Sequence, residues 1–369
     1  MINYHLKVRQ NSIILGLFLA LSLAALLWLR HSGTAQAPSA EGGLFYELTG
    51  LTENQCVGLV DGEEIPARLY LFYLACSCRY WDGRMYEENG KIPDWSAPMP
   101  DGVLYGDFLQ QEAWSLVFLQ ITVEHLARDY DIALSPAAQQ ALQREEAEYI
   151  RRCGSEEALD LALAAQGIDR ATFDRLRQFT HLYQTLLKLA ESEGSPLHPR
   201  EEELLSFGTG QDYLSWDLLL LRNSDDQGQP LDEAQRQKTL QKLQALLYQL
   251  QRSPDPAGLF TQLASLYSQD SRRILKPEGY TCPAQEVPQI FRAVLTLEEN
   301  GFSQVVETAD GWWILFRRPL QTPELIAPYF AHSLRQKAQC ITWNSRLPSQ
   351  LDLSAFYRAV QTMPDFPSA

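Results

Sequence analysis

The stretch "ETADGWWILFRRPL", residues 307–320, decides much of the fold of the second half of this chain. The pair Asp310-Gly311 is followed at once by two tryptophans and three further apolar residues. An Asp-Gly pair beside β-prone residues is a strong signal for a tight turn into a strand. Adjacent side chains of a strand point to opposite faces. We therefore expect Trp312 and Trp313 on opposite faces of that strand.

A second strand is predicted upstream, in "YLSWDLLLLRN" at residues 213–223. Four consecutive leucines between polar turns indicate a strand that is buried on both faces. Helical spacing of apolar residues follows over 232–252, 256–268 and 286–296. The order strand, three helices and two strands predicts a small α+β domain with an antiparallel sheet over residues 210–320.

The preceding region, residues 46–200, reads as a mostly helical domain that begins with a small hairpin around Asp61-Gly62. Ser135-Pro136 has the residue types of a helix cap and first turn. One helix is predicted to start near Pro66. Four more are predicted over residues 107–130, 136–152, 155–166 and 170–191. Two more helices are predicted at the C-terminal end, over 322–346 and 353–363, within a segment that spans 321–369.

The N-terminal residues 1–31 contain a long apolar run after Lys7 and Arg9. Such a run is a signal peptide or a membrane span. We favour an uncleaved anchor, because the small-residue site Ala35-Gln36-Ala37 is followed by Pro38. The positive-inside tendency then predicts a single-pass protein of the cell membrane with its body on the extracytoplasmic side. Residues 32–45, small and polar, read as a linker.

Composition excludes some classes of function. The net charge is −15, which argues against nucleic acid as a partner, since phosphate binding needs clustered positive charge. The six cysteines are scattered, and no histidine stands at metal-ligand spacing from them or from another histidine. The sequence therefore predicts no metal site and no cofactor, and phosphate-binding or hydrolase motifs are missing.

Several short motifs, in order and at the right distances, resemble a parvulin domain, the small peptidyl-prolyl isomerase unit. They are Ser215-Trp216-Asp217-Leu218-Leu219, Tyr267-Ser268-Gln269-Asp270, Ala293 with Leu297, Ser303 with Val306, and Thr308 with Gly311 and Ile314. The hairpin "VGLVDGEEIPA" and the segment "GSEEALDLALAAQGIDRATFDRLRQF" resemble the N-terminal chaperone module of the extracytoplasmic foldases related to PrsA and SurA. The resemblance covers nearly the whole chain after residue 45.

The resemblance implies a degenerate active site. Asp217 stands where the family places its first active-site histidine, and Trp313 stands at the second. Asp270 is the one polar active-site residue that is kept. The apolar positions that would hold a proline ring fall on Thr281, Glu286 and Ile290, and the glycine-rich segment before them is replaced by residues 276–279. We expect that a parvulin fold is kept here for binding and that the domain is catalytically inactive.

The resemblance also implies a chaperone that binds unfolded, exported polypeptides. The client-binding surface, or cradle, would use four aromatic residues of the helical module, Tyr70, Tyr73, Trp114 and Phe118. The competing interpretation places these residues in the core. The C-terminal helices would pack back onto that module. Two alternatives stay open, an active peptidyl-prolyl isomerase and an adaptor for one envelope partner, and a homodimer also stays open.

Overall fold

The computed structural model describes residues 43–225, 227–274, 279–349 and 351–362, which divide into two compact units. Unit 1 combines residues up to His198 with those from Phe330 onward, and unit 2 is Pro199–Tyr329. The anchor expected at residues 1–31 and most of the linker lie outside the described residues. Within the described ranges, no helix has both the length and the apolar character that a membrane crossing requires.

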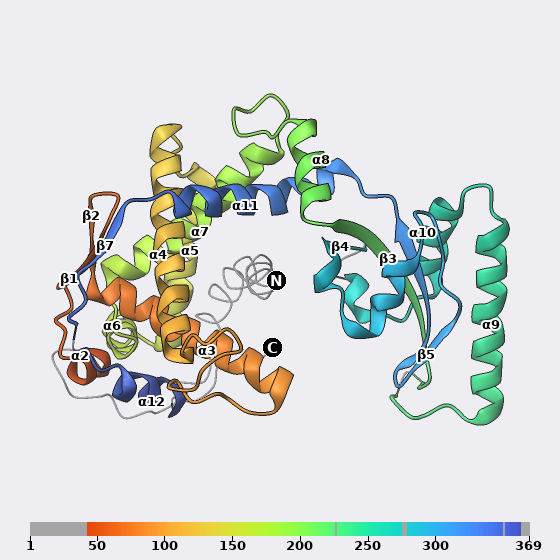
Figure 1. The fold of residues 1–369 in the computed structure, drawn as a ribbon, viewed down its shortest axis with the longest axis horizontal. Coiled ribbons are helices and arrows are strands. Elements are labelled where there is room, and N and C mark those ends of the chain that lie inside the picture. Colours follow the sequence, from red (N-terminus) through yellow and green to blue (C-terminus); the bar gives the residue numbers. More distant parts are fainter. Residues whose placement is uncertain (1–42, 226, 275–278, 350, 363–369) are drawn as a thin grey trace. The chain divides into compact units, whose positions relative to one another are not determined.

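Unit 1 is mostly helical (Figure 1). Ser135 and Asp169 cap two of its helices, and their side chains accept hydrogen bonds from the backbone N–H groups of Ala138 and Thr172. The helices are α2 (Leu44–Thr49), α3 (Ala67–Asn89), α4 (Tyr105–Asp129), α5 (Pro136–Cys153), α6 (Glu156–Ala165), α7 (Arg170–Glu191), α11 (Ile326–Gln339, in this unit from Phe330) and α12 (Ser354–Thr362).

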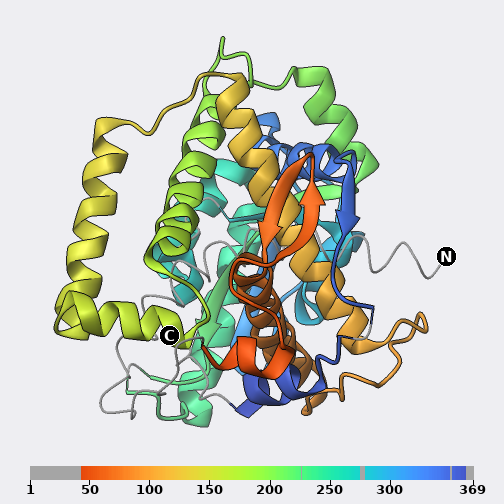
Figure 2. The same ribbon diagram turned by 90° about the vertical axis from the view of Figure 1, so that its left-hand side faces the viewer.

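A three-stranded antiparallel sheet of order β2-β1-β7 completes unit 1. Its strands are β1 (Cys56–Val60), β2 (Glu63–Pro66) and β7 (Trp343–Ser345). Figure 2 shows β7 as the outer strand beside the hairpin. The helix predicted over 322–346 is wrong at both ends. The observed helix α11 follows the 3-10 turn η4 (Thr322–Leu325) and ends at Gln339, and the residues Trp343–Ser345 beyond it pair with β1 as strand β7.

The C-terminal segment lies against the N-terminal helices of unit 1. The Tyr357 hydroxyl of α12 donates a 2.8 Å hydrogen bond to the Gly106 carbonyl at the start of α4. The Phe356 ring lies with its centroid 4.7 Å from that of Phe45 in α2. Residues distant in sequence therefore share one core in this unit.

Unit 2 has a four-stranded antiparallel sheet of order β4-β3-β6-β5 with helices on both faces. The predicted α+β class is confirmed. The segment predicted as a helix over 286–296 is instead two 3-10 turns around Pro288, and a fourth strand was not predicted. The elements are α8 (Glu201–Gly210), β3 (Tyr213–Arg222), α9 (Glu233–Arg252), α10 (Pro256–Tyr267), η1 (Ser271–Ile274), β4 (Tyr280–Pro283), η2 (Ala284–Glu286), η3 (Gln289–Thr296), β5 (Val306–Thr308) and β6 (Gly311–Arg318).

The central strands β3 and β6 separate two apolar layers, as the leucine run predicted. Leu219 and Leu221 pack with α9 and α10 on one face, while Leu218 and Leu220 pack with η3 on the other. Of the two tryptophans, Trp312 belongs to the α9–α10 layer and Trp313 to the η3 layer. The expected placement of these two residues on opposite faces is therefore confirmed.

Candidate functional site

The carboxylate of Asp217 forms a buried ion pair with Arg273. Both carboxylate oxygens lie 2.5 Å from Nη1 of Arg273, and one accepts a 2.7 Å hydrogen bond from the Leu218 N–H. Burial raises the pKa of Asp217 above its ordinary value, although the hydrogen bonds and charge of Arg273 act in the opposite direction. Asp217 is only 2% exposed. Its carboxylate is thus bound within the domain and is not presented to a ligand.

The structure does not bring Asp217 and Trp313 together. In the antiparallel register Asp217 lies opposite Phe316, and Trp313 lies opposite Leu220. Cross-strand partners share a face, and Phe316 belongs to the α9–α10 layer whereas Leu220 belongs to the η3 layer. The two positions that the family resemblance assigned to one polar centre therefore lie on opposite faces of the sheet.

Aromatic rings fill the interior around Trp313. This side chain is 2% exposed, its Nε1–H donates a 2.6 Å hydrogen bond to Thr308 Oγ1, and its ring meets Phe291 edge to face at 5.1 Å. Phe291 in turn lies 5.1 Å from the Trp216 ring, which stacks on Tyr280 at 4.5 Å. We call these four residues the aromatic cluster: Trp216, Tyr280, Phe291 and Trp313. It is a continuous packed layer between the sheet and η3.

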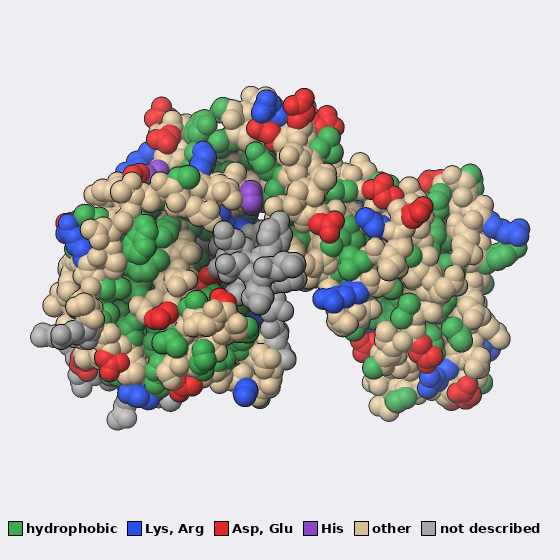
Figure 3. Space-filling view, in the orientation of Figure 1, with side chains coloured by type: hydrophobic (Ala, Val, Ile, Leu, Met, Phe, Trp, Pro, Cys, Tyr) green, Lys and Arg blue, Asp and Glu red, His purple; other side chains and the backbone are tan. Residues whose placement is uncertain are grey.

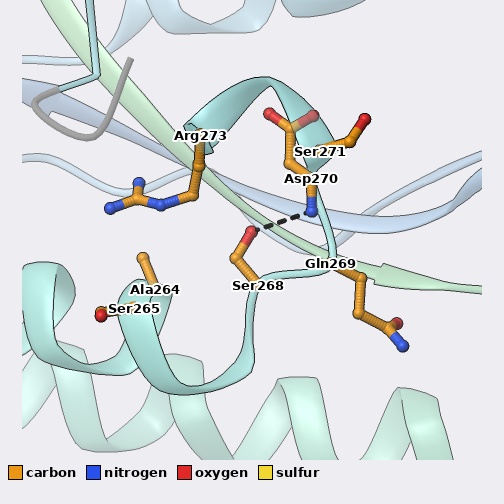
Figure 4. Close-up of a pocket in the computed structure, with 7 residues that line it drawn as sticks. All are labelled: Ala264, Ser265, Ser268, Gln269, Asp270, Ser271 and Arg273. Atoms are coloured by element: carbon orange, nitrogen blue, oxygen red, sulfur yellow. Dashed lines mark hydrogen bonds between the residues drawn. The ribbon is translucent and has the colours of Figure 1, made fainter. Parts of the chain in front are cut away.

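Asp270 lies at the edge of this cluster. The Tyr280 hydroxyl donates to its carboxylate at 3.3 Å, and its own backbone N–H lies 3.4 Å from Ser268 Oγ. Asp270 and Arg273 share a small polar pocket, and Figure 4 shows their side chains diverging from the same turn. The pocket is lined by Ala264, Ser265, Ser268, Gln269, Asp270, Ser271 and Arg273.

The three residues expected to hold a proline ring do not form a pocket together. Thr281 is committed to a polar network, because its hydroxyl lies 2.8 Å from Ser215 Oγ and donates to Glu324 at 2.7 Å. Ile290 is 54% exposed on η3, and Glu286 is half-buried at the end of η2. The segment 276–278 lies outside the described residues. The expected proline clamp is therefore not assembled by these side chains.

The polar network around Glu324 fastens η4 to the sheet. Its carboxylate accepts hydrogen bonds from Ser215, Thr281 and Arg318, the last at 2.9 Å. Burial acts to raise the pKa of Glu324, but these three hydrogen bonds hold it below its ordinary value. The arrangement links three strands of unit 2 to the turn that follows them.

In unit 1 the structure corrects most of the predicted client cradle. Tyr70, Tyr73 and Trp114 are buried. The Tyr70 and Trp114 rings are tilted against each other with centroids 4.8 Å apart, and the Tyr73 hydroxyl donates to Gln120 at 2.6 Å. They are core residues, because α3 and α4 turn these faces toward each other. Phe118 is half-buried and is the one predicted cradle residue that retains exposed surface.

Two residues that organise this region, Arg273 and Trp216, were not predicted as site residues. Nothing in the local pattern marked Arg273 as the partner of Asp217, because the contact spans 56 positions. The position of Trp216 in the core could have been predicted, since strand alternation places its side chain on the same face as Leu218 and Leu220. Among the described residues, no group of three or more histidine, cysteine or acidic side chains has the arrangement needed to hold a metal ion.

Comparison with known families identifies the domain. Residues 220–318 match the family described as Rotamase, the PPIC-type PPIase domain, which confirms the resemblance drawn from the sequence. Residues 220–318 therefore form a parvulin-type domain within this chain. No curated protein matches its sequence.

Among solved structures the chain is similar to PrsA foldases. PrsA from Bacillus subtilis is 17% identical, with 72% of this chain and 89% of that chain covered and a TM-score of 0.28. Foldase protein PrsA from Streptococcus pneumoniae is 16% identical, with coverages of 67% and 87% and a TM-score of 0.24. Peptidylprolyl isomerase PrsA from Bacillus anthracis is 14% identical, with coverages of 61% and 96% and a TM-score of 0.24.

Proposed function

We propose that this protein is a membrane-anchored, extracytoplasmic chaperone that binds unfolded exported polypeptides and whose parvulin domain does not catalyse isomerisation. The observation that carries the proposal is the aromatic cluster of unit 2. Trp216, Phe291 and Trp313 are packed ring against ring and buried on the face of the sheet that η3 covers. The sequence has no histidine between Pro199 and Tyr329.

The chemistry of prolyl isomerisation supports this reading. The enzyme must lower a rotation barrier of about 20 kcal/mol by binding the twisted amide better than either planar form. That task needs an open apolar pocket and polar groups that respond to the loss of amide resonance. Here Trp313 is enclosed and Asp217 is held by Arg273, so neither is available to a bound peptide.

Binding of unfolded chains is favoured by the surface of unit 1. Groups of apolar side chains are visible on this unit in Figure 3. Its exposed large apolar residues include Tyr86, Leu161 and Trp343. Membrane anchoring is proposed from Lys7, Arg9 and the apolar run that follows them, and recovery of the full chain in the membrane fraction, lost on deletion of residues 1–31, tests it.

The central experiment measures two activities of the full chain in parallel. We expect suppression of aggregation for several unrelated unfolded proteins and no acceleration of proline-limited refolding. The double variant Asp217→His with Trp313→His should gain no isomerase activity, because these positions lie on opposite faces of the sheet. Acceleration by the parent chain that is lost in Asp270→Ala would make the protein an isomerase. Suppression for a single protein only would make it an adaptor.

A further inference from the structure

The two edges of the sheet in unit 1 are built differently. The β2 edge carries Glu63, Glu64 and Pro66, which are residue types that protect an edge strand from pairing with another chain. The β7 edge consists of Trp343, Asn344 and Ser345, all of them exposed, with no charge and no proline inside the strand. No described strand pairs with its outer side. The β7 edge is therefore the one that can accept a further strand.

The ladder between β1 and β7 shows which backbone groups face outward. The Arg346 N–H donates to the Val57 carbonyl at 2.8 Å, and the Asp61 N–H donates to the Thr342 carbonyl at 2.7 Å. Because antiparallel strands alternate between bonded and non-bonded pairs, Asn344 also bonds toward β1. The N–H and C=O groups of Trp343 and Ser345 then point to the open side.

An apolar anchor stands beside these groups. Trp343 is 47% exposed. Its ring centroid lies 5.5 Å from that of Trp114 and 5.3 Å from that of Phe118. Trp114 also covers Gly58, where an added Cβ would lie 2.6 Å from the ring. The Trp343 ring thus packs on the rings of Trp114 and Phe118, and about half of its surface stays exposed to a ligand.

Charge indicates the kind of chain that fits. From Phe330 to Leu351 the sequence has Arg335, Lys337 and Arg346 and no acidic residue, within a protein of net charge −15. One acidic side chain of the hairpin lies nearby, since the Glu64 carboxylate is 3.9 Å from the Arg346 guanidinium. A second copy paired edge to edge would bring its own basic segment against this one, which like-charge repulsion opposes.

We propose that the β7 edge is a docking site for an extended segment of an unfolded polypeptide, with an apolar side chain over Trp343 and acidic residues beside it. The segment adds a strand to the sheet, so main-chain hydrogen bonds bind it irrespective of exact sequence, and Trp343 selects for apolar residues. This inference rests on the proposed function and names the site and the class of segment.

The test uses the full chain and a fluorescent synthetic peptide in which valine and phenylalanine alternate with glutamate. Ser345→Pro removes one outward N–H and leaves the bonds of Asn344 and Arg346 to β1, whereas the control Ser345→Ala keeps that N–H. Trp343→Ala removes the anchor, and Tyr248→Ala, at a residue 56% exposed on α9 of unit 2, is its matched control. Anisotropy should show binding weakened about tenfold or more by Ser345→Pro and by Trp343→Ala, and unchanged by the controls.

Two peptide variants test the same site with the unaltered protein. Successive N–H groups of an added strand point to opposite edges, and only one edge bonds to β7. N-methylation of every second peptide nitrogen should therefore abolish binding when the methylated groups face β7, and leave it unchanged when they face away. Replacement of glutamate by lysine should weaken binding, and the difference should shrink as salt is raised. Equal binding of all these peptides, no binding of any, or self-association through β7 in place of peptide binding would each overturn the proposal.

The failure of this site can be told apart from failure of the proposed function. If the chain suppresses aggregation while Ser345→Pro and Trp343→Ala bind peptide as the parent does, the site is wrong and the chaperone function stands. If the parent chain neither suppresses aggregation nor binds the peptide, the proposed function fails, and the docking site fails with it.

Discussion

The ion pair between Asp217 and Arg273 gives the most decisive prediction about unit 2. Asp217→Ala removes the carboxylate that pairs with the guanidinium of Arg273, a side chain that is only 11% exposed. Removing one partner of a buried pair costs about 3–5 kcal/mol, and the 2.5 Å contacts place this pair in that class. We expect the free energy of unfolding of unit 2 to fall by that amount.

The opposite truncation should be milder. In Arg273→Met the carboxyl of Asp217 can take up a proton, and burial already raises its pKa. The loss of stability should therefore be smaller than for Asp217→Ala and should shrink as the pH falls. The double variant Asp217→Leu with Arg273→Met replaces both charges by apolar groups, so it should be more stable than Asp217→Ala.

Urea unfolding followed by tryptophan fluorescence measures these differences, because unit 2 contains Trp216, Trp312 and Trp313. The pH dependence supplies a second readout. Because the folded pKa of Asp217 is raised, ionising this carboxyl costs more in the folded than in the unfolded protein, so the pH-dependent part of its contribution is fully present below the unfolded pKa and is lost as the pH rises through the folded pKa. This part is separate from the cost of removing the carboxylate from Arg273. That dependence should be missing from Asp217→Ala. A cost below about 1 kcal/mol for Asp217→Ala at neutral pH would refute the buried pair.

Three further predictions follow from single side chains. Glu324→Gln should lower stability by about 1–3 kcal/mol at neutral pH. Because the folded pKa of Glu324 is lowered, this difference should vanish as the pH falls through that value, and a constant difference in urea midpoints would contradict it. Burial raises the pKa of the Cys76 thiol to about 12, so alkylation of the native protein should label exposed Cys340 and leave Cys76 unmodified. Mass spectrometry locates the labelled residues, and rapid labelling of Cys76 before unfolding would be inconsistent with the fold. Trp313→Ala should cost about 3–5 kcal/mol in urea unfolding, and a loss under about 1 kcal/mol would mean that the aromatic cluster is not packed.

Local signals were sufficient wherever one segment decided its own structure. The Asp310-Gly311 turn, the leucine run of β3 and the caps at Ser135 and Asp169 each act within a few residues. Helix and strand periods differ, so these segments could be assigned without knowing their neighbours. The weaker assignments were short elements near prolines, such as η3 after Pro288, where no long period exists.

The candidate site was less predictable, because its residues come from separate elements. The family resemblance located Asp217, Asp270 and Trp313 but placed the first and last of them in one polar centre. Register decides otherwise, since a shift of one position moves a side chain to the other face of the sheet. Arg273, which binds Asp217, lies in a short 3-10 turn that carries no pattern.

The sequence by itself determined the α+β class, the two buried faces of β3 and the opposite placement of Trp312 and Trp313, because alternation and turn chemistry are local properties of the chain. The tertiary structure alone decided that Trp216 joins Trp313 in one aromatic cluster, that Tyr70 and Trp114 are core residues, and that the residues after α11 form the edge strand β7. Those outcomes depend on which distant segment occupies the facing surface. That choice is made by packing and by the pairing of backbone groups across the fold.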